Sequence, residues 1–511
     1  MSLTADLHLL LPEFVLAGLA LVVLAVDLVL PASRKLLLGW LSVAGLGGLI
    51  ALSLVLLWGE DQAMYGGLVQ VDAYSLFFKC FFMAMGIFII LSSMDYIEKY
   101  LTHPGEYYGL ILFSVLAMSV MAASRELLTA YIALELMSFC FYILASYAMT
   151  NAKSNEAGIK YVLIGAFSSA ILLFGVSLLY SSIGVTTYDG IHGVLAAGGE
   201  FSPALWVGIA LILVGLGFKM AAVPFHMWAP DVYEGAPLPV TAYLAVGSKA
   251  AAFALVLRLF AEAFIPTVDD WQIIVAVLAA VTMTVGNLVA IAQRNIKRLL
   301  AYSSVGQVGF LLLGIAALPN LEAPGPVSAL ASNGIMLHLV GYATTNMVVF
   351  VGVIAFFNLT GKEEIADFAG LADRHPFLAA SIAVGLFSLA GLPFFAGFTT
   401  KFYLFTAAAN EGLLWLASLA ILNSLISLYY YLVVIRHMYI QPVPEEAQAA
   451  GDAAPGAEAS AAVADSARLS PTPLILGVLA VLVLGTFFVG VYPFPIVEAL
   501  DAATASILPI N

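Results

Sequence analysis

Four ionisable side chains lie well inside long apolar stretches of the sequence: Glu135, Lys219, Lys249 and Lys401. A charge at the centre of a membrane-spanning helix costs at least about 2.5–3.5 kcal/mol, so such residues usually face a protein interior or water and serve a function. Removing a lysine from water destabilises its ammonium form, so a buried lysine can take up and release protons near neutral pH. These residue types therefore indicate proton transfer inside a membrane, with an inert buried ion pair as the alternative for Lys249.

A carboxylate that approaches a buried lysine favours its charged form, and withdrawal of that carboxylate favours proton release. We therefore expect Glu135 and Lys219 to form a pair whose separation changes during proton transfer. His338 is another ionisable group at mid-span, and it either relays protons or hydrogen-bonds a neighbouring backbone group. Lys79 and Arg258 lie close to helix ends, where a long side chain can also reach the membrane interface.

A second group of polar residues follows Lys219 in "FKMAAVPFHMWAPDVYEGAP", residues 218–237. His226, Asp231 and Glu234 stand there, just after Pro224. They either feed protons inward or cap and turn the chain, and for the two acids we favour the structural role.

The elements that position these residues are membrane helices. The 511 residues are 62% hydrophobic and only 10% charged, whereas soluble domains are about 25% charged. A bilayer core needs about 20 apolar residues per helix, and the alternating strands of a membrane β-barrel are absent. We therefore predict an all-α polytopic membrane protein with fourteen spans, near residues 9–30, 36–58, 73–95, 107–123, 126–149, 157–182, 203–223, 238–261, 271–291, 298–318, 331–357, 376–407, 412–438 and 471–492.

Two of these spans, the seventh and the twelfth, share a design of apolar helix, Gly/Pro interruption and embedded lysine. The interruptions carry Pro224 in one and Gly391, Pro393 and Gly397 in the other. Proline removes a backbone donor and clashes with the preceding turn, and freed carbonyls in a membrane must be satisfied by protein or water. Paired broken helices are typical of transporters with internal repeats. Because the two spans are five apart, we predict that spans 4–8 and 9–13 form two inverted five-helix repeats.

Basic residues set the expected orientation, because cytoplasmic loops retain Lys and Arg. The loops after even-numbered spans hold one basic residue, Arg125, and both termini are therefore expected on the periplasmic side. The loops after odd-numbered spans hold twelve: Arg34, Lys35, Lys99, Lys153, Lys160, Arg294, Lys297, Arg298, Lys362, Arg374, Arg436 and Arg468.

The chain divides into five expected regions. These are a three-helix region 1–106, the repeats 107–262 and 271–440, a disordered cytoplasmic loop 441–470, and a C-terminal helix with its tail, 471–511. The loop is rich in Ala, Pro and acidic residues and lacks large apolar residues to bury. The only cysteines, Cys80 and Cys140, exclude iron–sulfur clusters and Cys-based zinc sites within this chain. A net charge of −14 makes nucleic acid an unsuitable partner.

Several stretches carry a family resemblance. "FKMAAVPFHMWAPDVYEGAPLPVTAYL" (218–244), "QRNIKRLLAYSSVGQVGF" (293–310), "AGLPFFAGFTTKFYLF" (390–405) and "VDAYSLFFK" (71–79) resemble the subunit N family of bacterial proton-pumping NADH:quinone oxidoreductase, respiratory complex I. The likeness extends over nearly the whole chain. There are two departures: Phe394 and Phe395 follow "GLP", and helix 11 carries Asn346 and His338 where related subunits have a lysine.

The resemblance implies an antiporter-like subunit of the membrane arm in the cell inner membrane, beside further antiporter-like subunits. In that family the glutamate of helix 5 matches Glu135, and lysines of helices 7, 8 and 12 match Lys219, Lys249 and Lys401. These residues are implied to move protons outward along a mid-membrane axis, driven by quinone reduction elsewhere. The chain itself is expected to bind no cofactor, because FMN, the iron–sulfur clusters and quinone belong to partner subunits.

Two alternatives remain open from the sequence. A freestanding sodium/proton antiporter subunit would share the broken helices and the buried lysines. An equivalent subunit of a quinone reductase fed by ferredoxin or a deazaflavin would look the same, because electrons enter such complexes in other chains. A purely structural membrane subunit would leave the four mid-membrane charges without a use.

Overall fold

Nearly all of the chain is helical. The computed structural model describes residues 7–319, 329–442 and 470–508. Within these ranges, 13 helices are long and apolar enough to cross a membrane, and Pro376–Ala390 is a shorter apolar helix. The prediction of an all-α polytopic membrane protein is confirmed.

The N-terminal region consists of three long helices and one small hairpin. The helices are α2 (Leu11–Val29), α3 (Leu36–Leu57) and α4 (Ala73–Tyr100), and strands β1 (Gln62–Met64) and β2 (Val69–Val71) pair antiparallel between α3 and α4. Helix α4 begins at a capping box. Asp72 accepts a hydrogen bond from the Ser75 amide (2.7 Å), and the Ser75 hydroxyl accepts one from the Asp72 amide (3.0 Å). This exchange satisfies amide groups that the first helical turn leaves open.

The first predicted repeat contains the elements α5 (Pro104–Ala123), α6 (Leu127–Ala145), α7 (Ala152–Ile183), α8 (Tyr188–Ala196), α9 (Pro203–Met220), α10 (Trp228–Gly235), α11 (Leu238–Tyr243) and α12 (Lys249–Arg258). Two π-helical turns, Leu244–Ser248 and Leu259–Ala263, flank α12 and continue the eighth span. Proline occupies the first turn of α5, α9 and α11, where its missing N–H costs nothing and its φ suits the helix.

The second predicted repeat contains α13 (Val268–Ala290), α14 (Ile296–Ala316), α15 (Leu330–Thr360), α16 (Leu371–Arg374), α17 (Pro376–Ala390), α18 (Ala396–Asn410) and α19 (Leu414–Tyr439). Short 3₁₀ turns at Ile265–Thr267 and Ile365–Phe368 precede α13 and α16. Helices α22 (Pro473–Val491) and α23 (Phe494–Ala505) complete the described chain.

Local features recur at matching places in the two halves. Helices α7 and α15 both end at a left-handed glycine, Gly184 (φ 77°) and Gly361 (φ 68°), a conformation that glycine adopts without steric cost. The residue before α6 pairs with the loop after α7, Glu126 with Thr187, and the residue before α14 pairs with the loop after α15, Asn295 with Glu364. These features support the internal repeat, whose inversion remains a prediction.

Both broken spans end their first half in the same way. The Ala222 amide donates to the Gly217 carbonyl (2.8 Å), and the Leu392 amide donates to the Phe387 carbonyl (3.1 Å). In both cases the backbone turns left-handed just before the proline, at Ala221 (φ 62°) and Gly391 (φ 87°). The predicted breaks are confirmed, and each helix stops three or four residues ahead of its proline.

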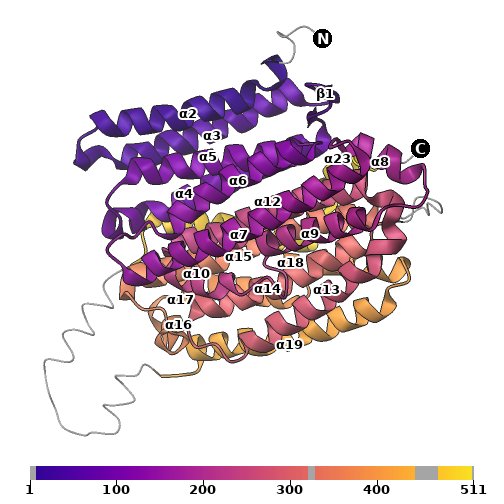
Figure 1. The fold of residues 1–511 in the computed structure, drawn as a ribbon. Coiled ribbons are helices and arrows are strands. Elements are labelled where there is room, and N and C mark those ends of the chain that lie inside the picture. Colours follow the sequence, from indigo (N-terminus) through magenta and orange to yellow (C-terminus); the bar gives the residue numbers. More distant parts are fainter. Residues whose placement is uncertain (1–6, 320–328, 443–469, 509–511) are drawn as a thin grey trace, which may run out of the picture.

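The helices lie side by side in one bundle, with α2 and α3 at one edge and α19 at the opposite edge (Figure 1). Helices α10 and α16 lie at one end of this bundle, while β1, α8 and α23 lie at the other. Under the orientation predicted from basic residues, the first end is cytoplasmic. The span analysis missed the short elements at both ends, because they lie in segments read as loops. The predicted disordered loop, 441–470, lies almost entirely outside the described residues.

Candidate functional site

Lys219 lies in the last turn of α9 and is 3% exposed. Its Nζ donates hydrogen bonds to the Ser138 hydroxyl (2.6 Å) and the Tyr142 hydroxyl (3.3 Å), both on α6. The same nitrogen is 5.5 Å from the ring centroids of Tyr142 and Phe218. The ammonium group is thus held by hydroxyls and aromatic faces, which interact favourably with a cation.

Glu135 lies on the same face of α6, one turn before Ser138. Its carboxylate accepts a hydrogen bond from the Ser169 hydroxyl of α7 (2.5 Å), and no ion pair joins it to Lys219 among the described residues. Lys219 instead binds Ser138, one turn further along α6, and a pair whose separation changes stays a prediction. Glu135 is only partly buried, and its helix neighbours Ile132 and Phe139 are 68% and 60% exposed.

Lys249 is 1% exposed and begins α12, directly after the π-helical turn Leu244–Ser248. Its Nζ donates to the Ser304 hydroxyl of α14 and lies 5.7 Å from the ring centroid of Tyr233 on α10. No carboxylate pairs with Lys249 in the part of the chain that the structure describes, so the alternative of an inert ion pair finds no support. π-Helical turns inside α-helices occur frequently at functional sites.

Lys401 follows the second break, on α18, and is 3% exposed. Its Nζ donates to the Leu389 carbonyl (2.8 Å) and to the Ser424 hydroxyl (3.2 Å) and lies 4.6 Å from the ring centroid of Phe310. In an unbroken helix the Leu389 carbonyl would accept from residue 393, but Pro393 has no N–H. The lysine, together with the Gln307 side-chain amide (3.3 Å), therefore satisfies a carbonyl that the break leaves free.

His338 lies on α15 and is 2% exposed. Its Nδ1 forms a 2.9 Å hydrogen bond with the Thr400 hydroxyl, rather than with the backbone. His338 and Lys401 line the same closed cavity of about 10 Å³, together with Gln307 and Ser388. The structure thus places these two ionisable groups at one site.

His226 takes a different place, in the turn between α9 and α10. Its side chain is half-buried and its ring is edge-on to that of Tyr302, with centroids 6.4 Å apart. No hydrogen bond joins it to Glu135, Lys219 or Lys401 among the described residues. His226 thus lies outside the hydrogen-bonded surroundings of the buried lysines, at the end of the bundle where α10 lies (Figure 1).

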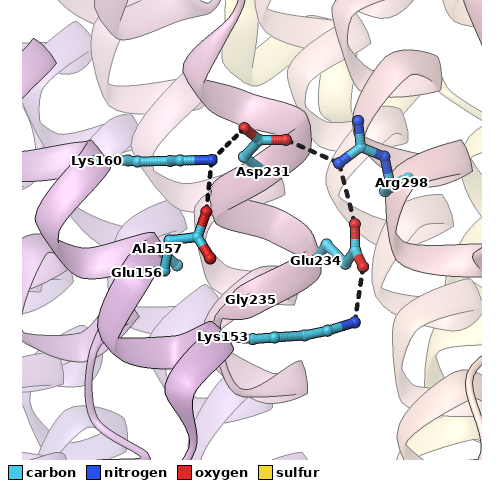
Figure 2. A pocket seen from close by; sticks show the side chains of 8 residues that line it. All are labelled: Lys153, Glu156, Ala157, Lys160, Asp231, Glu234, Gly235 and Arg298. Atoms are coloured by element: carbon cyan, nitrogen blue, oxygen red, sulfur yellow. Dashed lines mark hydrogen bonds and ion pairs between the residues drawn. The ribbon is translucent and has the colours of Figure 1, made fainter.

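Charged residues around α10 form what we call the α10 ion-pair network, around a cavity of about 210 Å³ (Figure 2). Glu234 pairs with Lys153 (3.0 Å) and with Arg298 (3.0 Å). Asp231 pairs with Arg298 (2.8 Å) and with Lys160 (2.8 Å), and Lys160 also pairs with Glu156 (2.8 Å). The network joins α10 to α7 and α14. Asp231 and Glu234 thus tie α10 to its neighbours by ion pairs, rather than capping the helix as the structural interpretation supposed.

Helix α10 lies outside the candidate spans, and its two acids are held ionised. Burial alone would raise the pKa of Asp231, but hydrogen bonds from Lys160 and Arg298 outweigh it and lower that pKa. Burial would likewise raise the pKa of Glu234, but hydrogen bonds from Lys153 and Arg298 outweigh it and lower that pKa. Acids with a lowered folded-state pKa contribute stability that is present above their unfolded pKa, about 4, and is lost as pH falls through the folded value.

The double variant Asp231→Asn, Glu234→Gln is therefore expected to lower the thermal midpoint of the purified protein by the same amount at pH 5.5 and pH 8. Both acids remain ionised in the wild type across this range. Thermal unfolding of wild type and variant at each pH measures the difference. A difference that vanished at pH 5.5 would contradict this account, because a group of the network would then titrate within the range.

Comparison with known proteins adds to this geometry. A profile of the family described as "NADH:quinone oxidoreductase/Mrp antiporter, TM" matches residues 124–427. NADH-quinone oxidoreductase subunit N of Moorella thermoacetica is 42% identical over 509 residues, which cover 99% of this chain and 100% of that protein. The chain belongs to the NADH-quinone oxidoreductase subunit N family. Its counterpart in Trichlorobacter lovleyi is 41% identical and covers 87% of this chain and 89% of its own length.

Solved structures share the fold of this chain. A chain of respiratory complex I from Thermus thermophilus with bound aureothin aligns with a TM-score of 0.75 and 28% identity, covering 96% of this chain and 99% of its own. A chain of the Mrp complex from Dietzia sp. aligns with a TM-score of 0.82 but only 21% identity, covering 99% of this chain and 98% of its own. The second likeness concerns the fold alone.

In this member of the subunit N family, sequence reasoning missed two buried ion clusters. Lys79 on α4 pairs with Glu13 on α2 (2.6 Å) and is 1% exposed. Arg258 is fully buried and pairs with Asp72 and with Glu262. Both basic side chains are buried in ion pairs, so the alternative in which they extend toward the membrane interface finds no support.

The cluster around Arg258 extends to the bundle end opposite α10. Arg125, the one basic residue expected there, pairs with Glu262 (2.6 Å) and with Asp189 (2.6 Å). The i,i+4 spacing of Arg258 and Glu262 was the available sequence signal, since such residues share a helix face. Nothing in the sequence indicated that Asp72, Arg125 and Asp189, which come from distant segments, would join the cluster. No group of three or more His, Cys, Asp or Glu suited to a metal ion occurs among the described residues.

Proposed function

We propose that the chain moves protons from the cytoplasm to the outside as the antiporter-like subunit N of a membrane-bound NADH:quinone oxidoreductase. One observation carries the proposal. Lys219, Lys249 and Lys401 are each at most 3% exposed, yet their polar partners are hydroxyls and one backbone carbonyl. A lysine needed only for stability would be paired with a carboxylate when buried. A buried lysine without such a pair can lose its proton and regain it.

The arrangement supports a sequence of charge-dependent steps. The Ser138 hydroxyl that binds Lys219 lies one turn along α6 from Glu135, so a small movement of α6 relative to α9 changes the distance between the two charges. A shorter distance favours the ammonium form of Lys219, and a longer one favours proton release. We propose that the released proton passes along α12 and α14, by Lys249 and Ser304, toward Lys401.

The second half of this route ends at the cavity that Lys401 shares with His338. We propose that His338 serves this member in place of the helix 11 lysine found in related subunits. Its Nδ1 is oriented by Thr400, which leaves the other ring nitrogen for proton exchange. His226, in the turn at the cytoplasmic end, is proposed only as an entry-side residue.

Electron transfer is assigned to partners. We propose that FMN, iron–sulfur clusters and quinone are held by other subunits, and that this chain contacts membrane-arm subunits, including further antiporter-like ones. The partly buried carboxylate of Glu135, beside the exposed Ile132 and Phe139, supports such a neighbour on α6. Purification of the tagged chain in mild detergent should recover NADH-oxidising, quinone-reducing activity. Recovery of the chain alone, with sodium/proton exchange, would instead identify a freestanding antiporter.

The proposed orientation places α10 in the cytoplasm of a bacterial inner membrane and both termini in the periplasm. Membrane-impermeant maleimide should label a cysteine at exposed Glu200 in intact spheroplasts and a cysteine at exposed Ser33 only in inverted vesicles. The opposite labelling pattern would overturn the orientation.

A further inference from the structure

Trp228, the first residue of α10, closes the broken end of α9. Its indole is 1% exposed, stacks on the Tyr161 ring (4.5 Å between centroids, 9° between planes) and lies 5.3 Å from the Phe218 centroid. The indole nitrogen donates a hydrogen bond to the Phe218 carbonyl (2.9 Å). A residue beyond the break is thus bound to the helix end that precedes it.

This hydrogen bond falls where the helix has lost its regular pattern. In a continuous helix the Phe218 carbonyl would accept from the Ala222 amide, but that amide turns to the Gly217 carbonyl. The Phe218 carbonyl instead accepts from the Ala221 amide (3.0 Å) and from Trp228. Buried carbonyls at a helix end need such partners, and here one of them is a side chain of the other half-helix.

Two short paths lead from the indole to the ammonium group of Lys219. Along the backbone, Trp228 binds the carbonyl of Phe218, the residue next to Lys219. The Phe218 ring centroid is 5.5 Å from the Lys219 Nζ. Through the side chains, Tyr161 meets Tyr142 edge-on (4.7 Å), and the Tyr142 hydroxyl accepts a hydrogen bond from Nζ (3.3 Å). A displacement of Trp228 therefore changes both the position and the partner of the ammonium group.

Helix α10 is also held in place by charge. Asp231 and Glu234 bind Lys160 and Lys153 of α7 and share Arg298 of α14. Figure 2 shows the two acids of α10 between these basic residues. Helix α10 is therefore a short element that the α10 ion-pair network fixes to α7 and α14 and that Trp228 joins to the end of α9.

We propose that Trp228 is a positioning residue for proton transfer, which holds the ammonium group of Lys219 against Ser138 and Tyr142. The inference rests on the proposed role of Lys219. Loss of the indole hydrogen bond loosens the joint between the half-helices and admits water to Lys219. Water stabilises the ammonium form, so proton release then requires a higher pH.

The test uses the assembled complex in inverted membrane vesicles and records NADH-driven proton translocation as a function of pH. Trp228→Phe, which keeps a ring beside Tyr161 but removes the donor, should move the alkaline limb of the profile upward by about half a pH unit or more. Trp271→Phe is the matched control. Trp271 is 3% exposed, and its indole also donates to a backbone carbonyl at 2.9 Å, that of Phe264.

A Trp228→Phe profile that superimposes on the wild type, or a Trp271→Phe shift of equal size, would overturn the proposal. If Trp228→Phe fails to assemble, Tyr161→Phe with Tyr161→Leu provides the second comparison, and only the leucine variant should shift the profile. Lys219→Ala, assayed in parallel, separates the two claims. Wild-type translocation in Lys219→Ala would refute the proposed function, whereas loss there with an unshifted Trp228→Phe profile would refute only the positioning role.

Discussion

Replacing Lys249 with methionine is expected to lower proton translocation and quinone reduction together, by about tenfold or more in the assembled complex. A positioned proton-transfer group contributes about 10²–10⁴-fold to a step that depends on it. Lys249 is 1% exposed and lies between the two halves of the proposed route, with Ser304 as its hydrogen-bond partner. Methionine fills a similar volume but carries no proton. NADH-driven quinone reduction and vesicle acidification, measured on the same membranes, quantify the effect.

The matched control is Lys99→Met. Lys99 is exposed at the end of α4, where its Nζ donates to the Asn358 carbonyl (3.2 Å), and its loss should leave both activities near the wild-type level. Co-purification of the other subunits shows that each variant has assembled. An assembled Lys249→Met complex that translocates protons at the wild-type rate would remove Lys249 from the route.

Arg258→Leu is expected to reduce the stability of the fold by about 3–5 kcal/mol, the usual cost of removing one partner from a buried ion pair. Arg258 is fully buried, and its partners Asp72 and Glu262 have side chains only 1% and 5% exposed. The variant leaves both carboxylates without this cation and also deprives the Ala122 carbonyl of a donor at 2.9 Å. The thermal unfolding midpoint of the solubilised protein, or its yield in assembled complex, measures the loss.

Two comparisons distinguish this mechanism from a general loss of packing. Arg258→Leu combined with Asp72→Asn should recover part of the stability, because one uncompensated charge is gone. Lys35→Met removes a more accessible pair, in which Lys35 lies 3.0 Å from Asp27 and its side chain is 24% exposed, and should cost less than about 1 kcal/mol. Equal losses in Arg258→Leu and Lys35→Met would contradict the account.

The sequence was sufficient for the spans and for both breaks. Apolar runs of membrane-spanning length have few alternatives to helix, because a bilayer leaves backbone groups no other way to be satisfied. Proline marks a break for an equally local reason. Lys219 and Lys401 were recognised because each is a charge within such a run, a signal that needs no knowledge of neighbours.

Interactions between distant segments left no such signal. Glu13 and Lys79 are far apart in the sequence, and only the folded structure shows that they pair. The same holds for Trp228 and Tyr161, whose rings stack because α10 folds back against α7. Near helix ends, sequence alone does not distinguish a side chain that reaches the interface from one that turns inward. Lys79 and Arg258 turn inward because each forms an ion pair with a buried carboxylate.

The most direct test of proton carriage by this chain is the rate of NADH-driven proton translocation, measured for the reconstituted complex in proteoliposomes. Glu135→Gln and Lys219→Ala each remove one member of the predicted pair on α6 and α9. The account predicts that each variant translocates protons more slowly than the wild type. Wild-type rates of translocation in both variants would contradict it.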